Sequence, residues 1–485
     1  MNFVSLQYIL FLPVTVLLYY LLPKKIKNPV LLAVSYFFYI CFGAKYAGFM
    51  IASTLTTYIA GILIARNALG KKKLWLVLTV ILNIGLLFFL KYYNFASQTL
   101  TSAFRLAGAD GALPMLNLLL PAGISFYTFM AVGYIVDVYK GKVPAEYNII
   151  DYALFVSFFP QITSGPIERA GNILPQLKAE RKFSIDKFRQ GLTLLVWGFV
   201  KKMILADNLA VIIANAFGNP RGYTGAQLAF ATLCFTLQIY CDFSACTDLA
   251  RGSAKLVGID LMKNFECPYI ATSLKDFWRR WHISLSSWFR DYLYFPLGGS
   301  RVPKWRHCLN IVIVFLVSGL WHGAALTYVV WGLFHGLFQV FGILLTPVRE
   351  KTVYRICGKD NKMLGFFKWL GTFFLVCVGW IFFRANSISD AFYIIKAIAK
   401  APFGNILPLA FAGMGLGRMT LCVLFGFTLL LAAVDVAAQK KDVLGYICGK
   451  FYLRYIIYLL LVLAIFFVGY YGPGFEPQDF IYFKY

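Results

Sequence analysis

LNIVIVFLVSGLWHGAALTYVVWGLFHGLFQVFGILL, residues 309–345, contains no Asp, Glu, Lys or Arg. An apolar run of about 18 residues or more is long enough to cross a bilayer as a helix. Comparable runs recur along the 485-residue chain, which is 60% hydrophobic with a mean hydropathy of +0.70. An outer-membrane barrel would instead have short segments of alternating polarity. The sequence therefore predicts an all-α polytopic membrane protein.

The apolar runs predict roughly eleven transmembrane helices. We expect spans over residues 6–22, 30–42, 48–65, 74–91, 115–139, 191–213, 226–249, 309–345, 364–383, 419–437 and 452–471. Between them we expect a polar extracytoplasmic segment at 92–112, a re-entrant piece at 150–165 and an amphipathic stretch at 167–190. The re-entrant piece is predicted because Pro160 and Gly165 interrupt a short helical pattern.

The chain reads as one membrane domain without internal repeats. We divide it into peripheral N-terminal helices (1–112), a core that carries the chemistry (113–345) and C-terminal helices (346–485). The first apolar segment lacks a basic region before it, so we expect a membrane span there and no cleavable signal peptide.

Basic residues outnumber acidic ones by 46 to 21, a net charge of +25. They gather in short loops, as at Lys71–Lys73, and form no aromatic-interleaved groove of the kind that binds nucleic acid. The positive-inside rule then places the N-terminus outside the cytoplasm. The ten cysteines form no CxxC pair, and we expect neither a disulfide framework nor a structural zinc.

Ionisable residues interrupt the predicted span 226–249. Asp242 and Asp248 lie about 240° apart around a helix, whereas Gln238 and Asp242 share a face. Such side chains are costly inside a membrane and mark either a functional site or an ion pair that fixes helix packing. Both alternatives, including pairing with a nearby arginine, stay open.

The stretch SLKDFWRRWHISLSSWFRDYLYFPLGGSR, residues 273–301, is rich in Trp, Arg and Tyr. Most of these residues suit a helix at the headgroup level, where aromatic rings and snorkelling arginines are favoured. His282 is different, because helical spacing places it on a face with Trp278, Leu285 and Phe289. That spacing predicts that the imidazole points to the apolar side of the helix.

His322 lies inside the opening stretch. Gly319 and Gly323 are four residues apart, as are Gly332 and Gly336, so both pairs allow close helix contact. His322 either hydrogen-bonds across such a contact or carries chemistry. His335 lies about 220° away around a continuous helix, so the two histidines do not bind a metal from one face. The sequence has no HExxH motif and predicts no metal site.

Neither a GxSxG motif nor a phosphate-binding loop is present, which disfavours a self-contained serine hydrolase and an ATP-driven pump. A neutral histidine in a desolvated site can act as a general base, since burial disfavours its charged form.

Five stretches resemble the membrane-bound O-acyltransferases, in the bacterial branch that contains the alginate O-acetyltransferases. They are PAGISFYTFMAVGYIVDVYKGKV (121–143), FVSFFPQITSGPIERAGNILPQL (155–177), YCDFSACTDLARGSAKLVGIDLMKNFECPY (240–269), the 273–301 stretch above and SGLWHGAALTYVVWGLFHG (318–336). The C-terminal DFIYFKY is also similar, so the resemblance covers essentially the whole chain.

The resemblance implies helices around a central tunnel that joins the two sides of the membrane. It makes His322 of the WHG motif the catalytic residue and places His282 of WHIS near the reaction centre. We predict substrate-binding roles for the following residues: Gln238, Asp242, Ser244, Asp248, Asn264, Trp278, Arg279, Arg290, Ser318 and Trp321.

The implied reaction is acetyl transfer from cytoplasmic acetyl-CoA to an extracytoplasmic acceptor, with no permanently bound cofactor. His322 would take a proton from the attacking hydroxyl, while His282 or a backbone N–H would steady the oxyanion. Proteins of this branch usually pass the acetyl group to a separate SGNH-type partner that works with the polysaccharide biosynthesis machinery. The resemblance thus implies an enzyme embedded in the lipid of the cytoplasmic membrane.

Two alternatives remain. One is transfer of D-alanine from a carrier-protein thioester towards teichoic acids, with the same histidines. The other is an ion-coupled transporter or flippase that uses Asp242, Asp248 and His322, although the paired broken helices common in transporters are not evident.

Overall fold

The chain folds into helices throughout the part that we describe. In this computed structural model these are residues 1–108, 113–118, 120–358, 361–401 and 414–472, and every regular element among them is helical. Among these residues, seven helices are long and apolar enough to cross a membrane, and two shorter apolar helices accompany them. The prediction of an all-α polytopic membrane protein is confirmed, whereas the number of about eleven crossings stays a prediction.

The residues form two compact units, 1–195 with 249–262 and 196–248 with 263–485. Each is described by itself. The predicted division of the chain after residues 112 and 345 stays a prediction.

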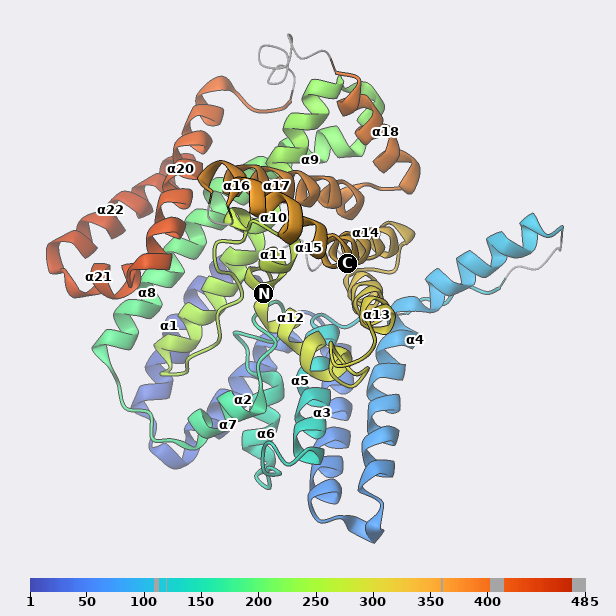
Figure 1. Cartoon of the computed structure of the whole chain (residues 1–485). Coiled ribbons are helices and arrows are strands. Elements are labelled where there is room, and N and C mark those ends of the chain that lie inside the picture. Colours follow the sequence, from blue (N-terminus) through green and yellow to red (C-terminus); the bar gives the residue numbers. More distant parts are fainter. Residues whose placement is uncertain (109–112, 119, 359–360, 402–413, 473–485) are drawn as a thin grey trace. The chain divides into compact units, whose positions relative to one another are not determined.

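The first unit contains the N-terminal helices (Figure 1). They are α1 (Leu6–Leu21), α2 (Lys24–Ile40), α3 (Ala44–Ala65), α4 (Lys72–Leu106), α5 (Ile124–Tyr139), α6 (Ile149–Ser157) and α7 (Ala170–Lys178), with the first part of α8 (Ile185–Phe199) and the end of α10 (Gly225–Leu256).

Two predicted boundaries in this unit are wrong. The helix of the span expected at 74–91 does not end there but continues as α4 to Leu106, and residues 109–112 lie outside the described ones. The extracytoplasmic side of segment 92–112 stays a prediction. The span expected to start at residue 115 becomes helical only at Ile124, because Gly123 precedes it with a φ of +70°. A Cβ there would lie 2.1 Å from the carbonyl oxygen of Ile162, so both conformation and space require glycine.

The predicted re-entrant piece is a short helix followed by turns. Helix α6 ends at Ser157, and residues 158–166 form a buried irregular segment before α7. Its buried backbone is partly satisfied by protein, since the Phe159 N–H donates to the Ser35 hydroxyl at 3.1 Å. The interruption at Pro160 is thus confirmed, and the depth of this segment in a membrane stays a prediction.

The second unit contains the remaining helices. After the end of α8 they are the π-helix η2 (Val200–Ala206), α9 (Asp207–Gly218), η3 (Pro220–Gly222), most of α10, η4 (Pro268–Ile270), α11 (Leu274–Arg280), α12 (Ile283–Phe289), η5 (Arg290–Tyr294), α13 (Lys304–His322), α14 (Leu326–Leu344), α15 (Thr346–Val348), η6 (Arg349–Val353), α16 (Tyr354–Cys357), α17 (Lys362–Arg384), α18 (Ile388–Ala399), α20 (Arg418–Lys440), α21 (Val443–Gly449) and α22 (Phe451–Val468).

The uncharged stretch 309–345 is two helices rather than one. Helix α13 ends at His322, residues 323–325 are not helical, and α14 begins at Leu326. The two helices lie side by side at backbone contact. A Cβ on Gly319 would lie 2.3 Å from the Tyr328 carbonyl oxygen, and one on Gly332 would lie 2.3 Å from that of Phe315. The prediction that glycines allow close helix contact is confirmed.

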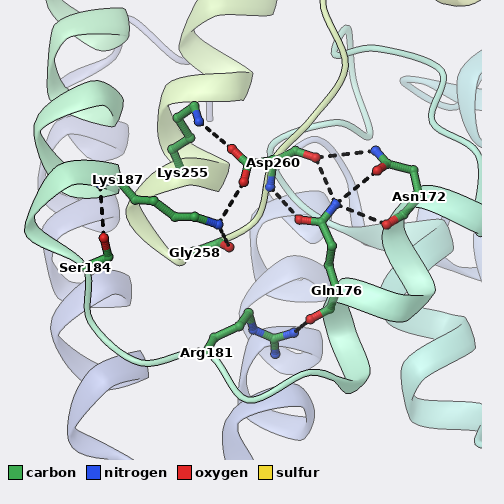
Figure 2. Close-up of polar contacts among 8 residues, drawn as sticks. All are labelled: Asn172, Gln176, Arg181, Ser184, Lys187, Lys255, Gly258 and Asp260. Carbon is green, nitrogen blue, oxygen red and sulfur yellow. Dashed lines mark hydrogen bonds and ion pairs between the residues drawn. The ribbon is translucent and has the colours of Figure 1, made fainter. Parts of the chain in front are cut away.

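In the first unit a hydrogen-bonded cluster around Asp260 ties the end of α10 to α7 and α8 (Figure 2). The Asp260 carboxylate accepts from Lys187 Nζ at 2.8 Å and also from Lys255 Nζ. The Gln176 side chain accepts from the Asp260 N–H at 2.8 Å and donates to the Asp260 carbonyl at 3.0 Å. Burial would raise the pKa of Asp260, but the hydrogen bonds from Lys187 and Lys255 outweigh it and hold that pKa below its ordinary value of 3.8.

We predict that Asp260→Asn lowers the free energy of unfolding by about 1 kcal/mol, since both ion pairs are partly exposed. A carboxylate with a lowered pKa stabilises the fold above its unfolded pKa and loses that effect as the pH falls through its folded pKa. The melting temperatures of wild type and variant should therefore differ at pH 7 and converge below about pH 4. A difference that stays constant down to pH 3 would contradict the role of the charge.

Candidate active site

His322 is the last residue of α13, not a residue in the middle of a span as predicted. The helix stops because Gly323 is extended, with a φ of −167°. A Cβ on Gly323 would lie 2.2 Å from the Tyr328 ring, so the first turn of α14 packs directly against this glycine. His322 is thereby placed at a helix end while its side chain stays buried.

The hydrogen bond of His322 fixes its tautomer. Its Nδ1 lies 2.6 Å from the carbonyl oxygen of Ser318, one turn earlier in α13. A carbonyl oxygen only accepts, so Nδ1 carries the hydrogen and the lone pair of a neutral ring is on Nε2. His322 therefore has the tautomer that a base acting through Nε2 requires.

Aromatic rings surround His322. Trp321, Trp331 of α14 and Phe383 of α17 contact it edge-on, with ring centroids 5.0, 4.9 and 5.6 Å from that of the imidazole. These rings exclude water and hold the imidazole plane. Electrostatic interactions are stronger in such a low-dielectric site than in water.

His282 lies between α11 and α12 with a left-handed backbone, φ 45° and ψ 54°. Such a conformation is strained for a non-glycine residue and persists only where neighbours hold it. Asn264 holds it here. Its carbonyl oxygen accepts from the Ile283 N–H at 2.9 Å, and its Oδ1 accepts from the Ser284 N–H at 3.0 Å and lies 3.3 Å from His282 Nδ1.

The two histidines share a neighbour. The Trp321 ring is 5.0 Å from His322 and 5.9 Å from His282, measured between ring centroids. His282 lies outside the seven long apolar helices and is 1% exposed. Burial, and then repulsion from the protonated form of His322, hold the pKa of His282 well below its ordinary value. His282 is therefore a neutral imidazole near His322 at physiological pH.

His282 was expected on the apolar side of a helix; its imidazole is indeed buried, but the single helix behind that expectation is wrong. The expectation assumed one helix through residues 277–292, whereas the chain breaks at Trp281–His282. His282 instead packs on Phe243 of α10, with ring centroids 4.7 Å apart. The predicted angle of about 220° between His322 and His335 also assumed a single helix. The two residues lie on different helices, α13 and α14, so that angle does not apply.

Asp242 and Asp248 of α10 form ion pairs with two consecutive lysines of the π-helix η2. Lys202 Nζ lies 2.8 Å from Asp242 and 2.9 Å from Asp207, and all three side chains are buried. Lys201 Nζ lies 2.7 Å from Asp248. One alternative from the sequence was that these aspartates form ion pairs with a nearby arginine and fix helix packing. The ion pairs are present, but the partners are lysines.

These pairs fix the part of α10 that packs on His282. Phe243 lies between Asp242, which Lys202 holds, and Ser244, whose hydroxyl oxygen is 2.9 Å from Lys201 Nζ. A buried charge is tolerated when it is paired, and removing one partner is costly. The substrate-binding roles of Asp242, Ser244 and Asp248 stay predictions.

The other predicted site residues divide into three groups. Asn264, Ser318 and Trp321 contact a histidine, and Trp278 contacts Trp331, which packs on His322. Gln238 is buried in α10. Arg279 and Arg290 are exposed and pair with Asp276 and Asp291.

Several residues of the site were missed. Trp331 and Phe383 supply rings around His322, and Lys201 with Lys202 anchors α10. The lysine pair was detectable, since two adjacent charges within the predicted span 191–213 needed buried partners. Trp331 was hidden among the many aromatic residues of a span. Among the described residues, no three His, Cys, Asp or Glu side chains are grouped so as to hold a metal ion.

Comparison with known proteins adds the family. Residues 141–383, half of the chain, match the model of the membrane-bound O-acyltransferase family. The chain belongs to that family. Its multi-pass membrane character and its enzyme class, an O-acetyltransferase, agree with the sequence prediction.

Three relatives illustrate the branches. A probable alginate O-acetylase of Pseudomonas aeruginosa is 37% identical over 80% of this chain and 73% of that protein. A peptidoglycan O-acetyltransferase of Helicobacter pylori is 33% identical over 80% and 77%. A teichoic acid D-alanyltransferase of Bacillus subtilis is 30% identical over 56% and 71%.

We predict that the contact between α13 and α14 is needed to place His322. Gly332→Ala puts a methyl group against the Phe315 carbonyl, and such overpacking costs about 1–3 kcal/mol. Transfer activity and melting temperature should both fall. Gly342→Ala is the matched control on the same helix, because no atom lies within 4 Å of its Cβ. Equal behaviour of the two variants would contradict the close-contact role.

Proposed function

We propose that this O-acetyltransferase takes an acetyl group from cytoplasmic acetyl-CoA and delivers it through a membrane tunnel to an extracytoplasmic hydroxyl. The acceptor belongs to a cell-surface polysaccharide or to an SGNH-type partner protein that modifies one. The enzyme lies in the cytoplasmic membrane with its N-terminus outside, and acetyl-CoA is a substrate rather than a resident cofactor.

The observation that carries the proposal is the hydrogen bond from His322 Nδ1 to the Ser318 carbonyl. It puts the lone pair of a neutral, buried imidazole on Nε2. In the proposed reaction the hydroxyl oxygen attacks the thioester carbon while its proton moves to Nε2. The carbon–sulfur bond then breaks, and the proton passes from Nε2 to the coenzyme A thiolate. The products are an acetyl ester and free coenzyme A.

The relatives support acetyl as the transferred group. The named O-acetylating relatives align over 80% of this chain, whereas the D-alanyltransferase of Bacillus subtilis aligns over 56%. The ion pairs of Asp242 and Asp248 with lysines offer a structural reason for these carboxylates, which weakens the transporter alternative. D-alanyl transfer remains the second candidate, since it would use the same imidazole.

We predict that His322→Ala lowers acetyl transfer by about a hundredfold or more, the usual contribution of general base catalysis. The measurement is alkali-labile acetate on isolated envelope polysaccharide from a deletion strain that expresses each variant. His307→Ala is the matched control, because it removes a histidine from the opposite end of the same helix, α13. Membrane levels of both variants are compared by immunoblot. Normal acetylation with His322→Ala at wild-type levels would contradict the base assignment.

The donor is tested separately with inside-out membrane vesicles. We expect transfer of label from [¹⁴C]acetyl-CoA, with release of free coenzyme A, and none from D-[¹⁴C]alanyl carrier protein. The opposite pattern would favour the D-alanyltransferase alternative, and ion flux without either donor would favour a transporter.

A further inference from the structure

The orientation of the Asn264 amide follows from its backbone partner. The Ser284 N–H donates to it at 3.0 Å, and a backbone N–H only donates. The amide atom at that position is therefore the oxygen. The same oxygen lies 3.3 Å from His282 Nδ1, so this ring nitrogen is the donor. His282 carries its hydrogen on Nδ1, and the lone pair of the neutral ring is on Nε2.

The two buried histidines thus have the same tautomer. His322 donates through Nδ1 to the Ser318 carbonyl, and His282 donates through Nδ1 to the Asn264 amide. Each neutral ring accepts a proton or hydrogen bond at Nε2. Neutral His282 cannot donate from Nε2 to an oxyanion, which is the role that the sequence suggested for it.

We propose that Asn264 is a positioning residue that fixes the tautomer of His282 and makes it a second proton acceptor beside His322. This inference rests on the proposed acetyl transfer. A single proton leaves the attacking hydroxyl for Nε2 of His322, is shared with the lone pair on Nε2 of His282, and ends on the coenzyme A sulfur when the carbon–sulfur bond breaks. Only one is charged at a time, because a charge on His322 opposes a charge on His282.

The side chain of residue 264 suits this role because an amide accepts the Nδ1 hydrogen without a charge. A carboxylate at that place would favour the imidazolium form of His282, as an opposite charge within hydrogen-bond distance does. Asn264 is itself buried, and no described residue accepts a hydrogen bond from its Nδ2. Replacing that NH₂ group by oxygen therefore breaks no hydrogen bond among the described contacts.

Other charged and titratable groups lie on the elements that pack around His282. They include Cys234, Tyr240, Cys241, Asp242, Cys246, Asp248, Arg251 and Lys255 on α10, Lys263 and Glu266 beside Asn264, Lys275, Asp276, Arg279 and Arg280 on α11, Arg290 after α12, and Lys304, Arg306, His307, Cys308 and His322 on α13. The two α10 carboxylates are paired with Lys202 and Lys201, and Lys263 and Glu266 are exposed. His322 is the group whose charge acts on His282.

The test is the pH profile of acetyl transfer by the purified enzyme in liposomes, with acetyl-CoA as donor and release of coenzyme A thiol as the readout. Asn264→Asp places a carboxylate against the Nδ1 hydrogen and raises the pKa of His282. If neutral His282 is required, the rising limb of the profile moves to higher pH by about one to two units. Activity is then lost over the acidic part of the profile, where wild type is still active, and recovered in more alkaline buffer.

Lys263→Met is the matched control. It changes the net charge by the same one unit at the adjacent, exposed position, and its profile should match that of the wild type. Asn264→Leu removes the acceptor of the Nδ1 hydrogen, and we expect a lower kcat with little change in the KM for acetyl-CoA.

Each outcome decides between roles. A profile of Asn264→Asp that extends activity to higher pH without loss at low pH means that His282 acts as a charged donor, and overturns the proposal. An unchanged profile with reduced amplitude means that Asn264 is only structural, and also overturns it. Absence of acetyl transfer by the wild-type enzyme is a failure of the proposed function, and it is seen before any variant is compared.

Discussion

The geometry of the site depends on one hydrogen bond at the end of a helix. His322 donates through Nδ1 to the Ser318 carbonyl, and α13 ends at this residue because Gly323 is extended and closely packed against Tyr328. The same bond holds the ring and selects its tautomer. The extended backbone of Gly323 ends α13 directly after His322. The end of the helix and the position of the imidazole therefore depend on the same residue.

A rigid surrounding keeps that bond in place. Glycines bring the backbones of α13 and α14 into contact, and the rings of Trp321, Trp331 and Phe383 enclose the imidazole. His282 packs against Phe243 of α10. The neighbours of Phe243 in the chain, Asp242 and Ser244, bind the buried side chains of Lys202 and Lys201. Buried ion pairs contribute little net stability, but once formed they resist disruption because an unpaired charge is costly.

The sequence predicted the fold class, the family and the glycine contact, because hydropathy, family motifs and residue spacing are local features. The catalytic roles of His322 and His282 stay predictions. Helix ends were predicted less well. The breaks at His322 and His282 depend on tertiary contacts, Gly323 against Tyr328 and Asn264 against residues 282–284, which involve positions apart in the chain. The lysine partners of Asp242 and Asp248 were missed for the same reason, although the adjacent charges of Lys201 and Lys202 in an apolar segment were a visible signal.

The central claim, that His322 is a neutral base with its lone pair on Nε2, is tested most directly by ¹⁵N solid-state NMR. The chain has four histidines, so uniform [¹⁵N]histidine labelling in lipid gives few signals, and His322→Gln assigns the relevant pair by difference. We predict a protonated Nδ1 and an unprotonated Nε2 for His322 at neutral pH. A hydrogen on Nε2 with an unprotonated Nδ1, or a ring protonated at both nitrogens, would contradict it.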